Sequence, residues 1–311
     1  MAGGQARIYA QKIRSTKELT QVFRAQELIA SSRIAAARSA QAAAVPYADA
    51  ITQAVSAVVI HNPDIDHALT RFKPGNNRAA VLLIAADRGM AGSYSSGLIR
   101  EAEGLLERLS RRTPPAQVDL YVAGRRAIGY YHYRDRELAG EWVYGSDRPS
   151  DDDAIAISNT LLDAFNRSTA DGGVGEVYVV YTKFINLVTQ QPKVVRMLPL
   201  AIVGEQGESA AAVAPAQRSE YPLYDFEPSE KLVLDALLPR YVAARIRSFM
   251  LEAAASEVAS RQRAMHTAVD NSHEMINKYT RMANAARQND ITQEITEIVS
   301  GANALNDDEE Y

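Results

Sequence analysis

Three things are missing from this sequence, and each excludes a class of function. The 311 residues include no cysteine, which rules out disulfides, thiolate metal sites and thiol catalysis. The longest purely apolar run, residues 79–86, is far shorter than the ~20 residues of a membrane-spanning helix. A net charge of −4 gives no reason to expect nucleic acid as a partner. With no apolar leader at residues 1–5, these features predict a soluble cytoplasmic protein.

Helix interrupters are also missing from the C-terminal part of the chain. Residues 240–305 contain no proline, and their only glycine is Gly301. Because proline and glycine are the usual helix interrupters, this stretch can form one helix, roughly 100 Å long at 1.5 Å per residue. Its apolar stripe, spaced mostly by three or four residues, consists of Met265, Val269, Ser272, Met275 or Ile276, Tyr279, Met282, Ala286, Ile295, Ile298 and Ala302. A helix of this length needs a long partner helix to cover the stripe.

The N-terminal part of the chain offers that partner. No glycine lies between Gly4 and Gly75, and residues 5–59 are predicted to be helical. Pro46 is expected to bend this helix or end it, and the His61-Asn62-Pro63 sequence to terminate it. The predicted seam follows a heptad-like spacing at Leu19, Val22, Gln26, Ile29, Arg33, Ala36, Ala40, Ala43, Tyr47 and Ala50. We therefore expect the two terminal helices to pair as an antiparallel coiled coil.

The middle of the chain alternates between strand and helix patterns. Strands are predicted at 78–85, 118–123, 176–182 and 193–203, and helices at 94–112, 124–134 and 151–166. The first strand is continuously apolar, as in a parallel sheet that is buried on both faces. Ser150 is expected to cap the helix that follows it, with three aspartates matching the helix dipole. This pattern predicts a Rossmann-like α/β domain.

These patterns suggest four parts of the chain. They are an N-terminal helix at 1–60, the α/β domain at 75–222, a C-terminal helical part at 223–306 and an acidic tail at 307–311. Within the third part, a short helix is expected to end at Leu238, and the long helix to begin at Pro239. The loop 204–217 is expected to be mobile.

No convincing catalytic constellation is present. Gly89, Gly92 and Gly97 lack the spacing of a phosphate-binding loop and are better explained by a structural tight turn. His266 and His273 lie seven residues apart, which is more typical of a surface stripe than of a metal site. We therefore expect no catalytic residue, no metal and no cofactor. Two alternatives stay open, namely a small nucleotide-dependent α/β enzyme with helical arms and a structural coiled-coil tether.

Three segments carry a resemblance to a known family. They are the N-terminal helix with K-I-R-S-T-K at 12–17 and E-L-I-A-S-S-R at 27–33, the D-R-G-M-A-G loop at 87–92, and the long C-terminal run from 259 to 302 that ends in I-T-Q-E-I-T-E-I-V-S-G-A. Taken in order over nearly the whole chain, they resemble the gamma subunit of bacterial F-type ATP synthases. The resemblance is weakest between 135 and 220.

The resemblance implies a non-catalytic rotor. In that family, the paired helices stand inside a hexamer of alpha and beta subunits, and the α/β domain sits on the membrane c-ring beside the epsilon subunit. The chain would then lie at the cytoplasmic face of the plasma membrane. Contacts with the alpha/beta head are expected from Leu28, Arg261, Arg287, Gln288 and Thr292.

Overall fold

The computed structural model describes residues 4–61, 69, 73, 75–200, 227 and 229–307. The expected mobile loop at 204–217 and residues 308–311 of the expected acidic tail lie outside the described residues. The chain divides into two compact units. Unit 1 consists of Met1–Ala30 with Gln262–Tyr311, and unit 2 is Ser31–Arg261.

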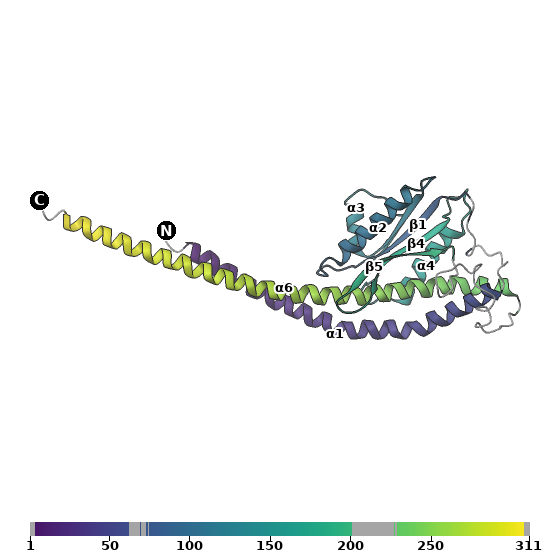
Figure 1. Cartoon of the computed structure of the whole chain (residues 1–311), viewed down its shortest axis with the longest axis horizontal. Helices are drawn as coiled ribbons and strands as arrows, with labels where there is room; N and C mark the ends of the chain where they lie inside the picture. Colours follow the sequence, from purple (N-terminus) through teal and green to yellow (C-terminus); the bar gives the residue numbers. More distant parts are fainter. Residues whose placement is uncertain are drawn as a thin grey trace. The chain divides into compact units, whose positions relative to one another are not determined.

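A five-stranded sheet forms the centre of unit 2, with strand order β3-β2-β1-β4-β5 (Figure 1). Its strands are β1 (Arg78–Ile84), β2 (Gln117–Ala123), β3 (Gly140–Trp142), β4 (Glu176–Phe184) and β5 (Gln190–Leu198). The first four strands run parallel, and β5 pairs antiparallel with β4. The predicted α/β class is confirmed. The sequence did not predict β3, because three residues are too few to show a period.

Helices cover both faces of this sheet (Figure 1). Helices α2 (Tyr94–Ser110) and α3 (Arg125–His132) pack on one face. Helix α4 (Asp151–Asn166) packs on the other face, together with parts of the two long helices. Because apolar layers enclose the sheet on both sides, every residue of β1 after Arg78 is buried. This explains why β1 shows a continuous apolar run rather than an alternating pattern.

The predicted cap of α4 is present as a capping box. The backbone N–H of Asp153 donates to Ser150 Oγ at 3.1 Å, and the backbone N–H of Ser150 donates to Asp153 Oδ2 at 3.1 Å. Two of the backbone donors that have no partner within the helix are thereby satisfied. The exchange fixes the point at which the chain turns into α4.

Two long helices complete the fold, and both pass through a proline. Helix α1 is Gly4–His61 with Pro46 inside it, and α6 is Glu230–Asp307 with Pro239 inside it. The prediction of a separate short helix ending at Leu238 was wrong. Leu234, Leu238 and Val242 are all fully buried, so continuous packing offsets the backbone hydrogen bond that Pro239 removes. Helix α1 extends to His61, and Asn62 and Pro63, which were predicted to help end it, lie outside the described residues.

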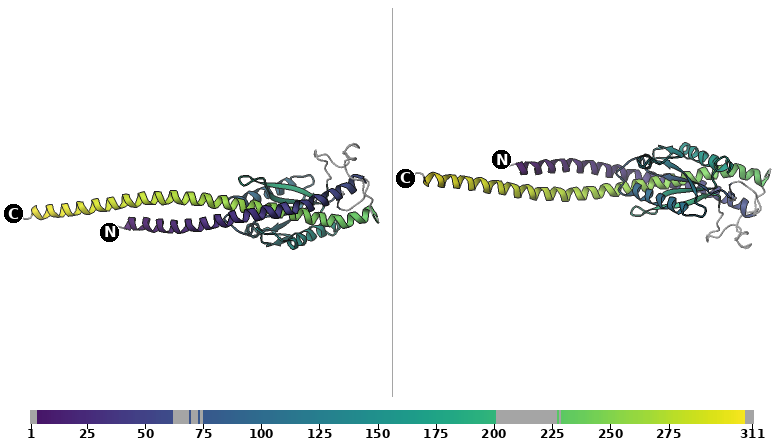
Figure 2. Two further views of the ribbon diagram at one scale, coloured as in Figure 1. Left: turned by 90° about the horizontal axis from the view of Figure 1, so that it is seen from below. Right: turned by 90° about the horizontal axis from the view of Figure 1, so that it is seen from above.

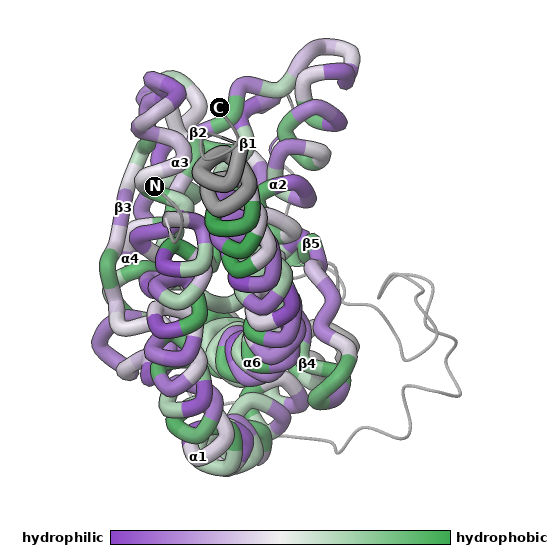
Figure 3. The backbone as a smooth tube through the Cα atoms, turned by 90° about the vertical axis from the view of Figure 1, so that its left-hand side faces the viewer, coloured by the Kyte–Doolittle hydropathy of each residue, from purple (hydrophilic) through white to green (hydrophobic). Residues whose placement is uncertain are grey.

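In unit 1, α1 and α6 run antiparallel and side by side (Figure 2). The rings of Tyr9 and Tyr279 stack with centroids 6.4 Å apart, whereas Glu27 meets His266. Residue numbers therefore rise along one helix as they fall along the other, and the predicted antiparallel coiled coil is confirmed. Figure 3 shows hydrophilic and hydrophobic segments alternating along both helices, as amphipathic helices require.

The seam of α1, however, lies one residue later than predicted. Its positions in unit 1 keep a regular three-and-four spacing and are the buried or partly buried Ala6, Tyr9, Ile13, Thr16, Thr20, Phe23, Glu27 and Ala30; of the predicted positions in unit 1, only Gln26 is also partly buried. The predicted Leu19 and Val22 are 52% and 48% exposed. Thr20 can occupy the seam because its hydroxyl donates to the Thr16 carbonyl at 2.7 Å, so no polar group is left without a partner. The seam therefore contains polar side chains, and α1 presents apolar ones outward.

On α6 the predicted seam was correct at Met265, Val269, Ser272, Ile276, Tyr279 and Ala286, which are buried or partly buried. It was wrong at Met282, before Ala286, and at Ile295 and Ile298 after it. All three are exposed, and residues 291–300 are exposed without exception. The described part of α1 begins at Gly4, close to the level of Ala286, and no described residue of unit 1 covers the rest of α6. The side chain of Ala302 lies outside the described residues.

Candidate functional site

The loop 87–92 follows β1, and its first residue ties three segments together. The Asp87 carboxylate accepts the backbone N–H of Arg125 at 2.8 Å, of Gly145 at 2.8 Å and of Ser146 at 3.0 Å. In return, the Asp87 N–H donates to Ser146 Oγ at 2.8 Å. Hydrogen bonding thus occupies both oxygens of the carboxylate, so Asp87 holds the loops at this edge of the sheet in place.

Gly89 and Gly92 lie in a tight turn, as predicted, whereas Gly97 lies inside α2. Met90 and Gly92 have positive φ angles of 63° and 57°. This conformation is uncommon for a side chain such as that of Met90, and glycine adopts it freely. The loop therefore has the strained, compact form of a structural turn.

Helix α6 covers the carboxyl ends of the central strands, where doubly wound folds usually bind ligands. The hydroxyl of Tyr94 donates to the Ala253 carbonyl at 3.1 Å, and Ser256 Oγ donates to the Thr182 carbonyl at 3.0 Å. The guanidinium of Arg261 donates from Nε to the Gly89 carbonyl at 3.3 Å. The glycine loop thus contacts a helix of its own chain, and this geometry gives no support to the alternative of a nucleotide-dependent enzyme.

Arg261 contributes to this contact as one half of a buried ion pair. Its Nη2 lies 2.5 Å from Glu257 Oε1, and the Glu257 side chain is 1% exposed. Burial raises the pKa of Glu257 above its ordinary value, although the positive charge of Arg261 opposes the shift. The resemblance suggested that Arg261 contacts a partner subunit. In the structure its side chain lies inside unit 2, where it holds α6 against the loop 87–92, and its contact with a partner stays a prediction.

The other four expected contact residues lie on the surface of unit 1. Leu28 is 71% exposed on α1, and Arg287, Gln288 and Thr292 are exposed on α6. The hydroxyl of Thr292 donates to the Gln288 carbonyl at 2.9 Å, one turn earlier in the same helix. The three α6 residues follow Ala286, the last buried position of the described seam, by one, two and six residues. They stand where α6 leaves the cover of α1.

Unit 1 exposes large apolar side chains along both of its helices. Its exposed apolar side chains are Ile8, Leu19, Val22, Leu28 and Ile29 on α1, and Met275, Met282, Ile291, Ile295, Ile298 and Val299 on α6. Apolar side chains that recur on the exposed faces of both helices suit a surface that binds another protein. This surface was not predicted from the sequence, because several of these side chains were expected to lie in the seam. The two helices contain more apolar residues than one seam can bury, and this excess was the signal in the sequence that could have indicated an exposed apolar surface.

The two C-terminal histidines connect the helices of unit 1. His266 Nδ1 lies 2.8 Å from Glu27 Oε1, and Arg24 donates to His273 Nε2 at 3.2 Å. The expectation of a plain surface stripe was therefore incomplete. Among the described residues, no group of three histidine, aspartate or glutamate side chains could hold a metal ion. In that same part of the chain, no helix has the length and apolarity needed to cross a membrane.

Fold and surface together define a coiled-coil protein with an α/β unit, whose most prominent surface is a helical one rather than a cleft. Comparison with known proteins identifies the family. The ATP synthase family profile matches residues 5–305. The chain is 52% identical to the ATP synthase gamma chain of Beutenbergia cavernae, over 98% of this chain and 99% of that one. It is 50% identical to the gamma chain of an Arthrobacter species, over 98% and 99%. The chain belongs to the ATP synthase gamma chain family.

Solved structures share the fold. A chain of the Euglena gracilis mitochondrial ATP synthase, in a cryo-EM structure of its OSCP/F1/c-ring, matches with a TM-score of 0.66 and 12% identity, over 100% of this chain and 97% of that one. A chain of the Tetrahymena thermophila mitochondrial ATP synthase central stalk and c-ring matches with a TM-score of 0.57 and 20% identity, over 79% and 99%. At these identities the likeness concerns the fold alone.

Proposed function

We propose that this chain is the central-stalk rotor subunit of an F-type ATP synthase and transmits rotation of the membrane c-ring to a catalytic hexamer of alpha and beta subunits. The single observation that carries the proposal is the match to bacterial gamma chains over nearly the whole length of both proteins. The chain itself is not catalytic in this proposal. The epsilon subunit and the c-ring contact the α/β unit, and the complex places the chain at the cytoplasmic face of the bacterial plasma membrane.

The geometry of unit 1 suits this role. Its two helices bury a regular seam between them and leave apolar side chains outside, where a surrounding hexamer can contact them. The two helices differ in sequence, so each orientation of the coil presents different side chains to each catalytic site. Orientation can then stabilise a different conformation at each site, which is the physical requirement for coupling.

Leu28, Arg287, Gln288 and Thr292 are the residues that we propose contact the alpha/beta head. All four are exposed on unit 1, and all four lie in segments whose sequence resembles the family. Arg287 supplies a charge and Gln288 an amide directly beyond the covered part of α6. Leu28 supplies an apolar contact from α1.

A purification experiment tests the proposed function. The tagged chain is expressed in its own cell type and recovered from solubilised membranes, and the proteins that accompany it are identified by mass. We expect alpha, beta and epsilon subunits in fixed proportion, with ATPase activity in the eluate. Recovery of the chain alone, with bound nucleotide or with an activity of its own, would contradict the proposal.

A further inference from the structure

Helix α1 passes through a stretch of unit 2 in which it is only partly buried, at Ile34, Ala37 and Gln41. From residue 31 to residue 43, no side chain of α1 is buried, whereas Ala30 before this window and Ala44 after it are. Further along, Val55 and Val58 join the main core of unit 2. Within that unit, α1 is therefore held firmly at its C-terminal end and loosely over this window.

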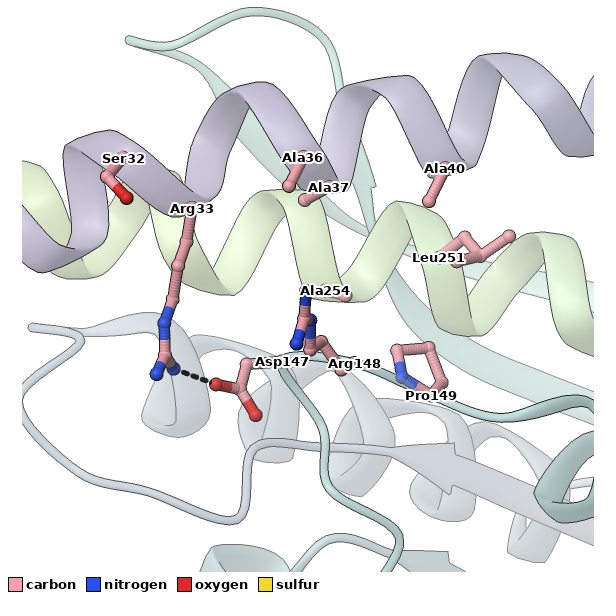
Figure 4. A pocket seen from close by; sticks show the side chains of 10 residues that line it. All are labelled: Ser32, Arg33, Ala36, Ala37, Ala40, Asp147, Arg148, Pro149, Leu251 and Ala254. Atoms are coloured by element: carbon pink, nitrogen blue, oxygen red, sulfur yellow. Dashed lines mark hydrogen bonds and ion pairs between the residues drawn. The ribbon is translucent and has the colours of Figure 1, made fainter.

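A cavity accounts for the loose packing. It has a volume of about 460 Å³ and lies between the alanines of α1, the loop 147–149 and two residues of α6, Leu251 and Ala254 (Figure 4). The α1 side of the cavity is formed by Ala36, Ala37 and Ala40, whose methyl groups are too short to fill the space. Dispersion contacts are lost wherever such a gap remains.

One ion pair bridges this window. Arg33 extends from α1, and its guanidinium pairs with the Asp147 carboxylate, as the dashed line in Figure 4 shows. The Asp147 side chain is only 11% exposed, and Arg88 of the loop 87–92 approaches the same carboxylate at 3.4 Å. Asp147 directly follows Ser146, which is buried and hydrogen-bonded to Asp87. Asp147 is thus adjacent to the residue whose hydrogen bonds with Asp87 fix this loop at the edge of the sheet.

We propose that Arg33 and Asp147 form a clamp that makes α1 turn together with the sheet of unit 2. Asp147 acts as a positioning residue, because it transmits force through Arg33 and contacts no substrate. This inference rests on the proposed rotor function. It adds that α1 receives its share of the torque through this pair, whereas α6 receives its share through the contact of Ser256 with Thr182 and that of Arg261 with Gly89. Without the clamp, the loosely packed window of α1 can yield while the sheet turns.

The test compares ATP synthesis with ATP hydrolysis in the complete complex carrying Arg33→Gln, Asp147→Asn or both. We expect the ratio of synthesis to hydrolysis to fall by roughly twofold to fivefold in each single variant, the size expected for the loss of one partly exposed ion pair. The double variant should be no worse than either single one, because the two residues act as a unit. Arg38→Gln, at another exposed arginine of α1, is the matched control and should leave the ratio unchanged.

A second measurement separates transmission from folding. The chain has no cysteine, so Arg33→Cys with Asp147→Cys introduces its only two thiols. A bismaleimide of about the length of the lost arginine side chain should restore the ratio when it joins them. An unchanged ratio in the single variants, additive losses in the double variant, or no recovery after cross-linking would overturn the clamp. A wild-type chain that does not co-purify with ATPase subunits would instead overturn the proposed function.

Discussion

Glu257 and Arg261 lie one turn apart on α6 and form an ion pair inside unit 2, with Nη2 and Oε1 2.5 Å apart. The same guanidinium reaches the Gly89 carbonyl. One side chain thus connects a buried carboxylate, a long helix and the turn after β1. The pair bears on both the stability of unit 2 and its response to pH.

Arg261→Met should destabilise unit 2 strongly, because it leaves the Glu257 carboxylate buried without a positive partner. Removal of one member of a buried pair typically costs about 3–5 kcal/mol. Urea unfolding followed by circular dichroism would measure the loss. Glu257→Gln combined with Arg261→Met removes both charges and should recover much of the stability. Equal losses in the single and the double variant would show that the charge pairing is not the cause.

Stability should also depend on pH through Glu257. Its pKa in the folded chain is raised above the ordinary value of 4.5, so the folded state binds the proton more tightly than the unfolded state does. The contribution of this residue to the free energy of unfolding is therefore greatest below pH 4.5 and decreases as the pH rises through the raised pKa. Comparison of wild type with Glu257→Gln across this range isolates the effect. A stability difference that stays constant with pH would contradict it.

Leu28→Lys should lower ATP synthesis more than ATP hydrolysis in the complex. The substitution places a charge on a side chain that is 71% exposed and is proposed to face the alpha/beta head. The stability of the chain itself should change by no more than about 0.5 kcal/mol, because the site is on the surface. Leu28→Met keeps the apolar character and serves as the control. Equal losses of the two activities in the lysine variant would count against the contact.

Ser150→Ala should weaken the start of α4. It removes the hydroxyl that accepts the Asp153 N–H, and the loss of such a cap typically costs about 1 kcal/mol. Asp152→Asn nearby changes charge without touching the capping box and should cost only a few tenths of a kcal/mol. The midpoint of urea unfolding distinguishes the two variants. A loss no larger for Ser150→Ala than for Asp152→Asn would show that the cap contributes little.

Pro46→Ala should stabilise α1. Proline inside a helix removes a backbone hydrogen bond and clashes with the preceding turn, at a cost of about 3 kcal/mol. Because α1 continues through Pro46 in the structure, alanine can restore the bond without rearrangement. The melting temperature should rise, and the exposed substitution Asp49→Ala is the control. A fall in melting temperature would mean that the local geometry of α1 depends on the proline ring.

Local signals in the sequence were sufficient for much of the fold. The apolar run at 79–86 identified β1, and the Ser150 cap with its aspartates located the start of α4. The positions of α1 that face α6 could not be predicted from the sequence in the same way. Leu19 and Val22 are more apolar than Thr20 and resemble core residues, but the positions that face α6 are decided by the partner helix and by the hydrogen bond of the Thr20 hydroxyl. Apolar residues needed for an external partner look like core residues in a single sequence.

Part of the candidate site was likewise predictable from the sequence, and part was not. Exposure of Leu28, Arg287, Gln288 and Thr292 agrees with a surface role, and their contacts stay predictions. Arg261 looked equivalent to Arg287, since both are arginines on one long helix. Only the fold shows that the loop 87–92 and Glu257 meet the first of them. The spacing of Glu257 and Arg261 by four residues is visible in the sequence, but the contact of Arg261 with Gly89, 172 residues away, leaves no local trace.

The regular three-and-four spacing of the seam in unit 1 has a mechanical consequence. An average repeat of 3.5 residues requires the two helices to wind around each other in a left-handed sense. Twisting such a pair in its own sense tightens it, and twisting in the opposite sense unwinds it. The coil of unit 1 should therefore resist torque more strongly in one direction of rotation than in the other.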